Sequence, residues 1–503
     1  MNERAAGIMV PRKEEAEIED SHKMGTAGPE IAGAALLLQK KRVLILALLA
    51  VLLIFPGLKR TGLAGYDDAF HAHEGREMAT SGDWGNIRFN GRITFDYLPM
   101  FCWMEAASFK VLGINDFAAK FPAALLGLGT IVLLYFLTLE LTGQAWLALL
   151  AMMVLMSTQF FLKLAGHAMT DVPFTFFFTL AIFLYLKGLK KPPYLALLGV
   201  PIGLGLLTRS LIGLLPLGVI VLHLFFSKRH KLLFSPWLAL GVLLALSFPS
   251  AWLAVQVRHH GVTALTSHFG FVQGKLHTSE ATSQWPSLLN YPVALFKYYW
   301  PWLPFLLAGF VHAARATISR RDTVSALLIV WVLVVLVSFS FAQTRYPRYI
   351  LSAFPAFSIL SAIALHRWLP NGRRDWFFKG ACLAGCLAVF LTIVFPAKQR
   401  ATDILALAPV ADANSRPEER IFFYTYEDKR NDFEWQYLWY GHRYTELPPT
   451  LKTLATRLTQ ENRATGIVDN VSYQQLFGQL PPETSQQMRI LARSENLVCF
   501  QLY

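Results

Sequence analysis

The feature that most constrains this chain is a series of apolar stretches, each long enough to cross a lipid bilayer. A helix of about 17 to 25 apolar residues covers the hydrocarbon core of a membrane. Such stretches recur at 41–58, 118–138, 145–163, 172–188, 234–256, 294–313, 323–342, 349–368 and 376–395. Because only helices and closed barrels satisfy their backbone groups in lipid, this pattern predicts an all-α polytopic membrane protein.

One further apolar stretch, 194–227, is interrupted in its middle by the polar sequence TRS at 208–210. Basic residues lie before it, at 187–191, and after it, at 228–231. Lys and Arg flank membrane spans on the cytoplasmic side. Both clusters should therefore face the cytoplasm, which requires two crossings between them and gives about eleven transmembrane helices in total.

The same rule orients the whole chain. Basic clusters recur on one side at every return except the turn near 141–144, which holds no Lys or Arg: they lie at 40–42, 187–191, 228–231, 315–321 and 367–374. With 54% hydrophobic residues, the net charge of +13 is better explained by these loops than by a nucleic-acid surface, and we expect no nucleic-acid partner. We expect a multi-pass protein of the inner (plasma) membrane with a cytoplasmic N-terminus.

The chain divides into three regions by composition. Residues 1–39 are of mixed charge and are predicted to form a disordered cytoplasmic tail. Residues 40–395 form the predicted transmembrane domain, in which the long outer loop 59–117 should contain juxtamembrane helices. Residues 396–503 contain four short strand patterns and one amphipathic helix, and they predict a small α/β domain on the periplasmic or extracellular side.

Ionisable residues at the ends of the predicted spans gather on the outer face, apart from the cytoplasmic basic clusters. Ionisable groups near a membrane are costly and usually mark a site. Five separate loops contribute to this face, as expected for a pocket built on a helical bundle. The residues are Asp67, Asp68, Asp171, Arg209, His268, Arg345 and Arg348.

The segment DDAFHAHEGREM (67–78) is the most polar part of the first outer loop. By itself it allows two interpretations. Asp67 or Asp68 is either a reactive carboxylate or the cap of a short helix, where aspartate accepts free backbone N–H groups. His71 and His73 are more simply explained as interfacial or hydrogen-bonded side chains than as ligands.

Taken together, these motifs resemble the lipid-to-acceptor glycosyltransferases of the GT-C fold, especially the aminoarabinose transferase of lipid A and its protein O-mannosyltransferase (PMT) relatives. The resemblance covers roughly residues 40 to 370. The matching motifs are the acidic pair at 67–68, REM at 76–78, SGDW at 81–84, FD at 95–96 and Asp171, with LTRSLIGLLP and RYILSAFPA near the later spans.

The resemblance implies a GT-C fold and transfer of a sugar from a polyprenyl-phosphate donor to lipid A, another envelope glycan or a protein on the outer face. Direct displacement would invert the anomeric configuration. Asp67 would act as base for an acceptor hydroxyl, or would position an acceptor that is itself a phosphate. Asp171 would be the second carboxylate, and Asp68 completes the acidic pair.

Arginine binds phosphate oxygens in a bidentate way, so Arg209, Arg345 and Arg348, with Arg92 behind them, are candidates for the donor phosphate. The alternative role for Arg345 and Arg348 is structural: each side chain would extend along the apolar surface to place its charge at the membrane interface. The aminoarabinose transferases place Lys-Pro after the Phe-acid pair, where this chain has Tyr97 and Leu98.

The resemblance also raises a divalent metal as an alternative, with Asp96 and His268 as its candidate ligands; no other cofactor is implied. A different class of function, a transporter or flippase of a lipid-linked sugar, usually places charges at the bilayer midplane between internal repeats. This chain shows neither feature. A scaffold without catalytic activity is disfavoured by Asp67 and Asp171. The sequence names neither the sugar nor the acceptor.

Overall fold

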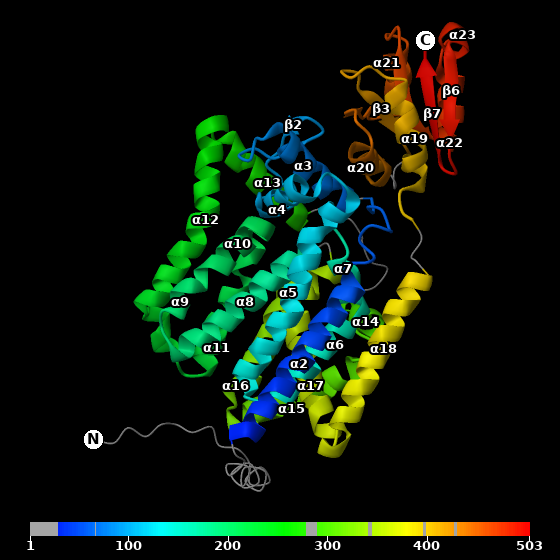
Figure 1. Ribbon diagram of the computed structural model, residues 1–503. Helices are drawn as coiled ribbons and strands as arrows, with labels where there is room; N and C mark the ends of the chain where they lie inside the picture. The colour runs from blue at the N-terminus through cyan, green and yellow to red at the C-terminus, as the bar shows by residue number, and fades with distance from the viewer. Residues whose placement is uncertain (1–28, 66, 278–288, 341–344, 396–398, 427–429) are drawn as a thin grey trace.

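The computed structural model describes residues 29–65, 67–277, 289–340, 345–395, 399–426 and 430–503. Long helices form one bundle, short helices and a β-hairpin cover one end of it, and a C-terminal α/β unit lies beyond that end (Figure 1). The predicted all-α bundle with a small α/β unit is thereby confirmed. The bundle elements are α2 (Pro29–Ile54), α5 (Asp116–Thr142), α6 (Ala145–Ser157), α7 (Gln159–Ala165), α8 (Asp171–Lys190), α9 (Tyr194–Leu197), α10 (Gly199–Arg209), η2 (Ser210–Leu214), α11 (Leu215–Phe226), η3 (His230–Phe234), α12 (Pro236–His260), α14 (Asn290–Tyr298), α15 (Leu303–Arg320), α16 (Thr323–Ser340), η4 (Pro347–Ala353), α17 (Phe354–Trp368), η5 (Asn371–Arg373) and α18 (Arg374–Val394).

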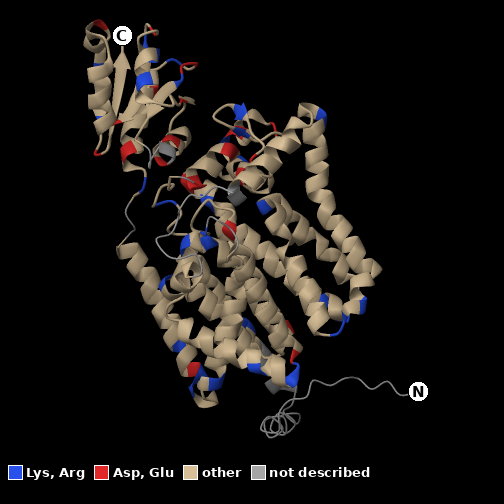
Figure 2. Ribbon diagram, turned by 180° about the vertical axis from the view of Figure 1, so that it is seen from behind, with Lys and Arg blue, Asp and Glu red and all other residues tan. Residues whose placement is uncertain are grey.

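Seven helical segments in the described chain are long and apolar enough to cross a membrane, or eight if the bent pair α6–α7 forms one span. The protein is therefore a multi-pass membrane protein. The prediction of eleven crossings is not settled by this count, because the count takes 194–226 as one segment and includes neither α2 nor α15. The bundle interior is apolar. Lys and Arg gather at the end of the bundle where α2 begins (Figure 2).

The stretch around residues 208–210 folds as a hairpin of two short helices. Arg209, at the end of α10, pairs with Asp171 at the start of α8. His223, near the end of α11, lies 2.6 Å from the Tyr185 hydroxyl near the other end of α8. α10 therefore runs toward the start of α8, and α11 runs back toward the other end of α8. This return agrees with the prediction that the chain crosses the membrane twice between the two basic clusters.

Part of the segment predicted to be a disordered tail is helical. Residues 1–28 lie outside the described residues, whereas α2 begins at Pro29. The expectation of a disordered segment up to residue 39 is therefore wrong for residues 29–39. The helix that contains the first predicted span, 41–58, therefore begins earlier than expected, at Pro29.

The loop 59–117 forms a compact layer over one end of the bundle. It contains α3 (Asp67–Ser81), the antiparallel strands β1 (Arg88–Phe89) and β2 (Arg92–Ile93), and α4 (Met100–Leu112), and α13 (Thr263–His277) joins it. The SGDW motif makes a turn in this layer, because the Asp83 carboxylate accepts from the backbone N–H groups of Gly85 and Asn86. Asn115 then caps α5 by accepting from the Ala118 N–H.

The C-terminal unit is a five-stranded sheet with helices on both faces. The strand order is β4-β3-β5-β7-β6; β3 pairs in parallel with β4 and β5, and β7 is antiparallel to β5 and β6. One apolar core lies under α21 and α22, and another lies under α19 and α20. The elements are α19 (Thr402–Ala413), β3 (Ile421–Tyr424), α20 (Arg430–Tyr440), β4 (Thr445–Glu446), α21 (Leu451–Leu458), β5 (Ala464–Asp469), α22 (Asn470–Gln479), α23 (Pro482–Gln486), β6 (Met488–Arg493) and β7 (Leu497–Leu502).

Candidate functional site

A cavity of about 220 Å³ with several charged lining residues opens where the loop layer meets the bundle. Parts of the chain that are far apart in sequence meet here: the first turn of α3, the loop before α4, the start of α8, the α10–η2 turn, α13 and η4. We call it the charged cavity. Its polar lining residues are Asp67, His71, Asp96, Tyr97, Thr170, Asp171, Thr208, Arg209, Ser210, His268, Arg348 and Tyr349.

Two carboxylates in the charged cavity are paired with arginines. The Arg348 Nη2 atom lies 2.5 Å from Asp67 Oδ2, and Arg348 Nε lies 3.9 Å from Asp171 Oδ2. Arg209 donates to the other Asp171 oxygen. Arg348 thus links both carboxylates, and with Asp96 the cavity is lined by three acidic side chains and two arginines.

The two arginines are also held by aromatic rings. The Arg348 guanidinium lies 4.5 Å from the centroid of the Tyr346 ring, and the Arg209 guanidinium lies 5.2 Å from that of Tyr349. Stacking on a ring orients a guanidinium without occupying all of its N–H groups. Both arginines can therefore present donors to an anionic ligand in the cavity.

Asp68 does not line the charged cavity, contrary to its expected place in the reaction centre. Its carboxylate is fully buried and lies 2.9 Å from His167 Nδ1 and 3.7 Å from Arg400 Nη1. Burial opposes ionisation, but the His167 charge and hydrogen bond, with Lys120 and Arg400, outweigh it and lower the pKa of Asp68. Asp68 therefore ties α3 to the loop after α7 and to the approach to α19.

Two of the four predicted phosphate-binding arginines lie outside the charged cavity. Arg345 Nε donates to the Ser340 carbonyl at 3.1 Å. Arg92 is exposed on β2. Neither is among the residues that line the cavity, so the geometry favours Arg209 and Arg348 alone for an anionic ligand there.

Asp96 and His268, the pair expected to hold a metal, both line the charged cavity. The ring nitrogens of His268 lie 2.9 Å from the Phe95 carbonyl and 3.2 Å from the Ser210 hydroxyl. Across the described chain, no three His, Cys, Asp or Glu side chains come together as a metal-binding group. The residues present therefore do not fit a bound metal, and we derive no step through one.

The two histidines of the polar segment have different surroundings. His73 is fully buried, and its Nδ1 and Nε2 lie 2.9 Å from the Leu438 carbonyl and 3.1 Å from the Asn90 N–H. It is therefore a hydrogen-bonded core histidine, as its simpler interpretation predicts. His71 instead lines the charged cavity.

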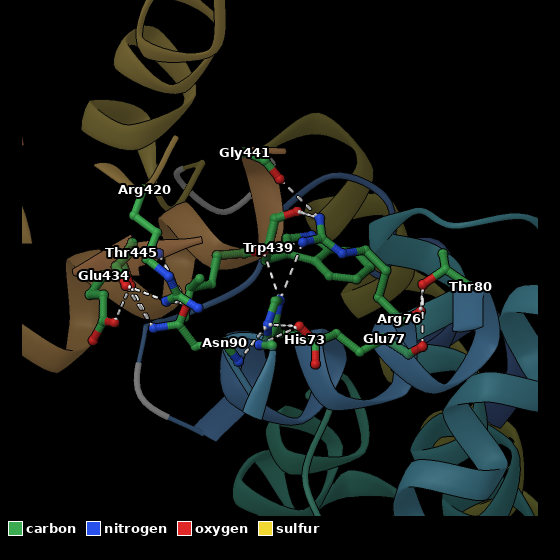
Figure 3. Close-up of polar contacts among 12 residues, drawn as sticks. His73, Arg76, Glu77, Thr80, Asn90, Arg420, Glu434, Trp439, Gly441 and Thr445 are labelled. Carbon is green, nitrogen blue, oxygen red and sulfur yellow. Dashed lines mark hydrogen bonds and ion pairs between the residues drawn. The ribbon is translucent and has the colours of Figure 1, made fainter. Parts of the chain in front are cut away.

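Arg76 of the REM motif docks the C-terminal unit onto α3 (Figure 3). Its guanidinium donates to the carbonyls of Leu438, Trp439 and Gly441 at 2.5, 2.7 and 3.0 Å, at the C-terminal end of α20. A cation at this end of a helix complements its free carbonyls and its dipole. The motif thus fixes α20 over the loop layer.

Two further concave surfaces border this region. An interdomain cavity of about 1000 Å³ lies between the loop layer and the C-terminal unit, with Arg76, Asp116, Arg420 and Tyr444 among its lining residues. An apolar groove of about 620 Å³ runs between α11 and α16. Leu211 lines both this groove and the charged cavity. The apolar groove therefore begins beside the charged groups.

The sequence pattern placed Asp67, Asp171, Arg209 and Arg348 on one face, and the structure brings them into one cavity. The pattern did not indicate His71, Ser210 and Tyr349 as lining residues. A signal for His71 was present, because a carboxylate three residues later on a helix lies on the same face. No comparable local signal marks Ser210 or Tyr349.

Comparison with known proteins finds sequence similarity over part of this chain. A family model described as dolichyl-phosphate-mannose-protein mannosyltransferase matches residues 96–254. An undecaprenyl phosphate-alpha-4-amino-4-deoxy-L-arabinose arabinosyl transferase of Pseudomonas fluorescens is 28% identical over 64% of this chain, and an uncharacterised protein of Aquifex aeolicus is 27% identical over 64%. The matches cover only 59% and 63% of the lengths of these two relatives.

The crystal structure of ArnT from Cupriavidus metallidurans bound to undecaprenyl phosphate is similar over almost the whole chain. Its TM-score is 0.72 at 18% identity, and the match covers 91% of this chain and 97% of that one. The likeness therefore extends over the bundle, the loop layer and most of the C-terminal unit. At this identity it establishes the fold alone.

Proposed function

We propose that this chain is a glycosyltransferase of the GT-C type, which includes the aminoarabinose transferases and protein O-mannosyltransferases, and that it moves a sugar from a polyprenyl-phosphate donor to an envelope acceptor. The chain is a multi-pass membrane protein with the fold of ArnT over almost its whole length. The acceptor is lipid A, another glycolipid or glycan, or a protein. Transfer takes place on the outer face of the membrane.

The observation that carries this proposal is the pairing of Asp67 and Asp171 with Arg348 and Arg209 in one cavity. Breaking the bond between the sugar and its carrier leaves negative charge on a phosphate, which preorganised arginines stabilise. The anomeric carbon develops positive charge in the same step, and nearby carboxylates stabilise that charge. The cavity therefore supplies positive and negative side chains close to each other.

The apolar groove supports a donor with a long hydrocarbon chain. It is lined mainly by aliphatic side chains of α11 and α16, and it meets the charged cavity at Leu211. A phosphate held by Arg209 would stand at the start of this groove. We propose that the polyprenyl chain follows the groove into the membrane.

The outer-face location rests on the basic clusters. With these clusters in the cytoplasm of an inner-membrane protein, the charged cavity and the C-terminal unit face the opposite side. We propose that residues 1–39, of which 29–39 belong to α2, lie on the cytoplasmic side, that 40–395 form the catalytic membrane domain, and that 396–503 form an outer domain. The outer domain would cover the loop layer through the contacts that Arg76 makes.

Mass spectrometry of envelope lipids and glycoconjugates tests the proposal in cells that lack this protein. We expect one glycoconjugate to lose a sugar mass while a polyprenyl-phospho-sugar accumulates. Wild-type protein should restore the glycoconjugate, whereas Asp67→Asn should not. Full complementation by Asp67→Asn would overturn the proposal and favour a transporter or a scaffold, and an unchanged glycoconjugate profile in cells without the protein would also overturn it.

A further inference from the structure

The segment 61–65, which joins α2 to α3, is bonded through its backbone to α20 of the C-terminal unit (Figure 1). The Leu63 N–H donates to the Tyr440 hydroxyl at 2.7 Å, and the Leu63 carbonyl accepts from Gln436 Nε2 at 3.2 Å. Asp67 lies only two residues beyond this segment. The C-terminal unit therefore holds the part of the chain from which the first turn of α3 starts.

Two glycines let the main chains of this segment and of the C-terminal unit approach closely. At Gly65, an added Cβ would lie 2.7 Å from the Asp432 Cα atom, a distance too short for a Cβ contact. Gly62 has a φ of +61°, and an added Cβ there would lie 3.1 Å from the Arg400 carbonyl oxygen. The Arg400 N–H donates to the Thr61 carbonyl at 3.0 Å. The close fit leaves the segment little freedom to shift while the unit is docked.

The side chain of Arg400, two residues before α19, reaches a buried pair formed by His167 and Asp68. Arg400 Nη1 lies 3.1 Å from His167 Nε2, and His167 Nδ1 lies 2.9 Å from Asp68 Oδ2. A guanidinium has N–H donors and no acceptor, so His167 Nε2 accepts from Arg400 and the Nδ1–H group donates to Asp68. The three side chains thus form one directed chain of hydrogen bonds.

This chain ends beside both carboxylates of the charged cavity. Asp68 directly follows Asp67 on α3, and its Oδ2 also accepts from the Ala64 N–H at 3.2 Å. His167 lies four residues before Asp171, in the turn that leads into α8. The bond between Asp68 and His167 therefore fixes the first turn of α3 against the start of α8, and so sets the separation of the two cavity carboxylates.

His167 and Asp68 lie outside the charged cavity itself. Both are buried, and neither is among the residues that line the cavity. A hydrogen bond to a charged group is stronger away from water, so the pair holds its geometry firmly. Reacting groups must be held closely, because a misplacement of about 1 Å costs roughly 10²-fold in rate. A pair that fixes the first turn of α3 can therefore control the rate without touching the substrate.

We propose that His167 and Arg400 are positioning residues of the proposed glycosyl transfer, and that through them the docked C-terminal unit holds the two cavity carboxylates in their reactive positions. This inference rests on the proposed function and leaves the proposed roles of Asp67 and Asp171 unchanged. It gives the C-terminal unit a part in turnover beyond covering the loop layer. Separation of the unit from the segment 61–65 would withdraw Arg400 and loosen the pair behind the cavity.

The test compares kcat and the donor KM of full-length variants in lipid nanodiscs, with the polyprenyl-phospho-sugar and acceptor identified in cells. Arg400→Gln should lower kcat by about ten- to 10²-fold, as expected for a misplacement of up to about 1 Å. The KM for the donor should stay near that of the wild type, because Arg209 and Arg348 still bind its phosphate. Arg400→Lys should recover part of kcat, since an ammonium group can still donate to His167 Nε2.

A double-mutant cycle shows whether the two residues act through one chain of hydrogen bonds. His167→Asn keeps an amide donor for Asp68 but removes the acceptor for Arg400, so it should lower kcat as Arg400→Gln does. The double variant should lose no more than either single variant, because each breaks the same chain. Residues that only stabilise the fold would lower the folded fraction, measured by size-exclusion chromatography, and leave the kcat of folded protein unchanged.

Arg463→Gln is the matched control. Arg463 Nη2 donates to the Asn414 carbonyl at 3.0 Å within the C-terminal unit, so this variant should keep the wild-type kcat. Folded Arg400→Gln with the wild-type kcat would overturn the inference and leave the transferase proposal standing, and His167→Asn gives the same test if Arg400→Gln does not fold. Additive losses in the double variant, or an equal loss in Arg463→Gln, would also overturn it. Wild-type protein that transfers no sugar would instead remove the proposed function.

Discussion

Arg348 and Asp67 are separated by 281 residues in the chain, yet their side chains lie 2.5 Å apart in the charged cavity. The same guanidinium approaches Asp171 at 3.9 Å. One arginine from η4 therefore links the first turn of α3 to the first turn of α8. Its removal should affect both carboxylates at once.

Arg348→Gln should lower turnover by about 10²- to 10³-fold, the usual effect of removing a preorganised donor at a site of developing negative charge. Arg348→Lys should recover only part of this loss, because a lysine cannot donate to two oxygens through a planar fork. Initial rates with purified protein measure both effects. Arg345→Gln is the control and should stay near the wild-type rate, since Arg345 bonds Ser340 outside the cavity. Equal losses in Arg345→Gln and Arg348→Gln would contradict this assignment.

Substitution of the adjacent residues Asp67 and Asp68 should have different effects on activity and on thermal stability. Asp68→Asn should lower the melting temperature in detergent at neutral pH, because it removes the anion that pairs with His167 and Arg400. Asp67→Asn should lower activity with a smaller effect on melting. Thermal unfolding followed by intrinsic fluorescence distinguishes the two. A larger melting shift for Asp67→Asn than for Asp68→Asn would refute the structural role of Asp68.

The Asp68 contribution should also depend on pH. Its folded-state pKa lies below its unfolded value, so its stabilising effect is complete above that unfolded value, near pH 4, and is lost as pH falls through the folded pKa. The difference in melting temperature between wild type and Asp68→Asn should therefore shrink below about pH 4. A difference that stays constant from pH 7 to pH 3 would show that the effect does not come from ionisation.

Arg76→Ala should loosen the C-terminal unit from the loop layer without unfolding the sheet. It removes hydrogen bonds to three carbonyls at the end of α20, and one such bond from a charged donor contributes about 1.5 to 3 kcal/mol. Hydrogen–deuterium exchange should rise at 430–440 and stay unchanged in β5 and β7. Arg489→Ala, at an exposed position on β6, should leave the exchange at 430–440 unaltered. Unchanged exchange in Arg76→Ala would mean that other contacts suffice to dock α20.

Gly218→Phe tests the path of the donor chain. Gly218 lines the apolar groove, and an added Cβ would lie 3.8 Å from Val334 Cγ1. The phenyl ring should occupy the groove and raise the KM for a long polyprenyl donor by about tenfold, which corresponds to roughly two methylene groups left unburied. A donor with two isoprene units should be unaffected.

Gly380→Phe is the control for this substitution. Gly380 lies on α18, where an added Cβ meets no atom within 4 Å, so the ring should not touch the groove. A similar rise in KM in both variants would point to a general effect of the bulky side chain. If the KM does not rise in Gly218→Phe, the polyprenyl chain of the donor does not follow this groove.

The sequence indicated the bundle and the face on which its charged residues gather. Apolar length and the side preference of Lys and Arg are local properties, so they need no contacts to be recognised. They sufficed to group Asp67, Asp171, Arg209 and Arg348 on one side of the membrane. They could not separate Arg348 from Arg345, because both lie in the same short loop and only the direction of each side chain differs.

The distinction between Asp67 and Asp68 likewise came only from the tertiary structure. Successive residues on an α-helix point about 100° apart, so one of the two faces the cavity and the other faces the core. Helix rotation is set by distant partners such as His167 and Arg400. The sequence by itself thus determined a membrane bundle with one polar face. The tertiary structure decided which side chains on that face meet, because their partners lie on helices brought together only by packing.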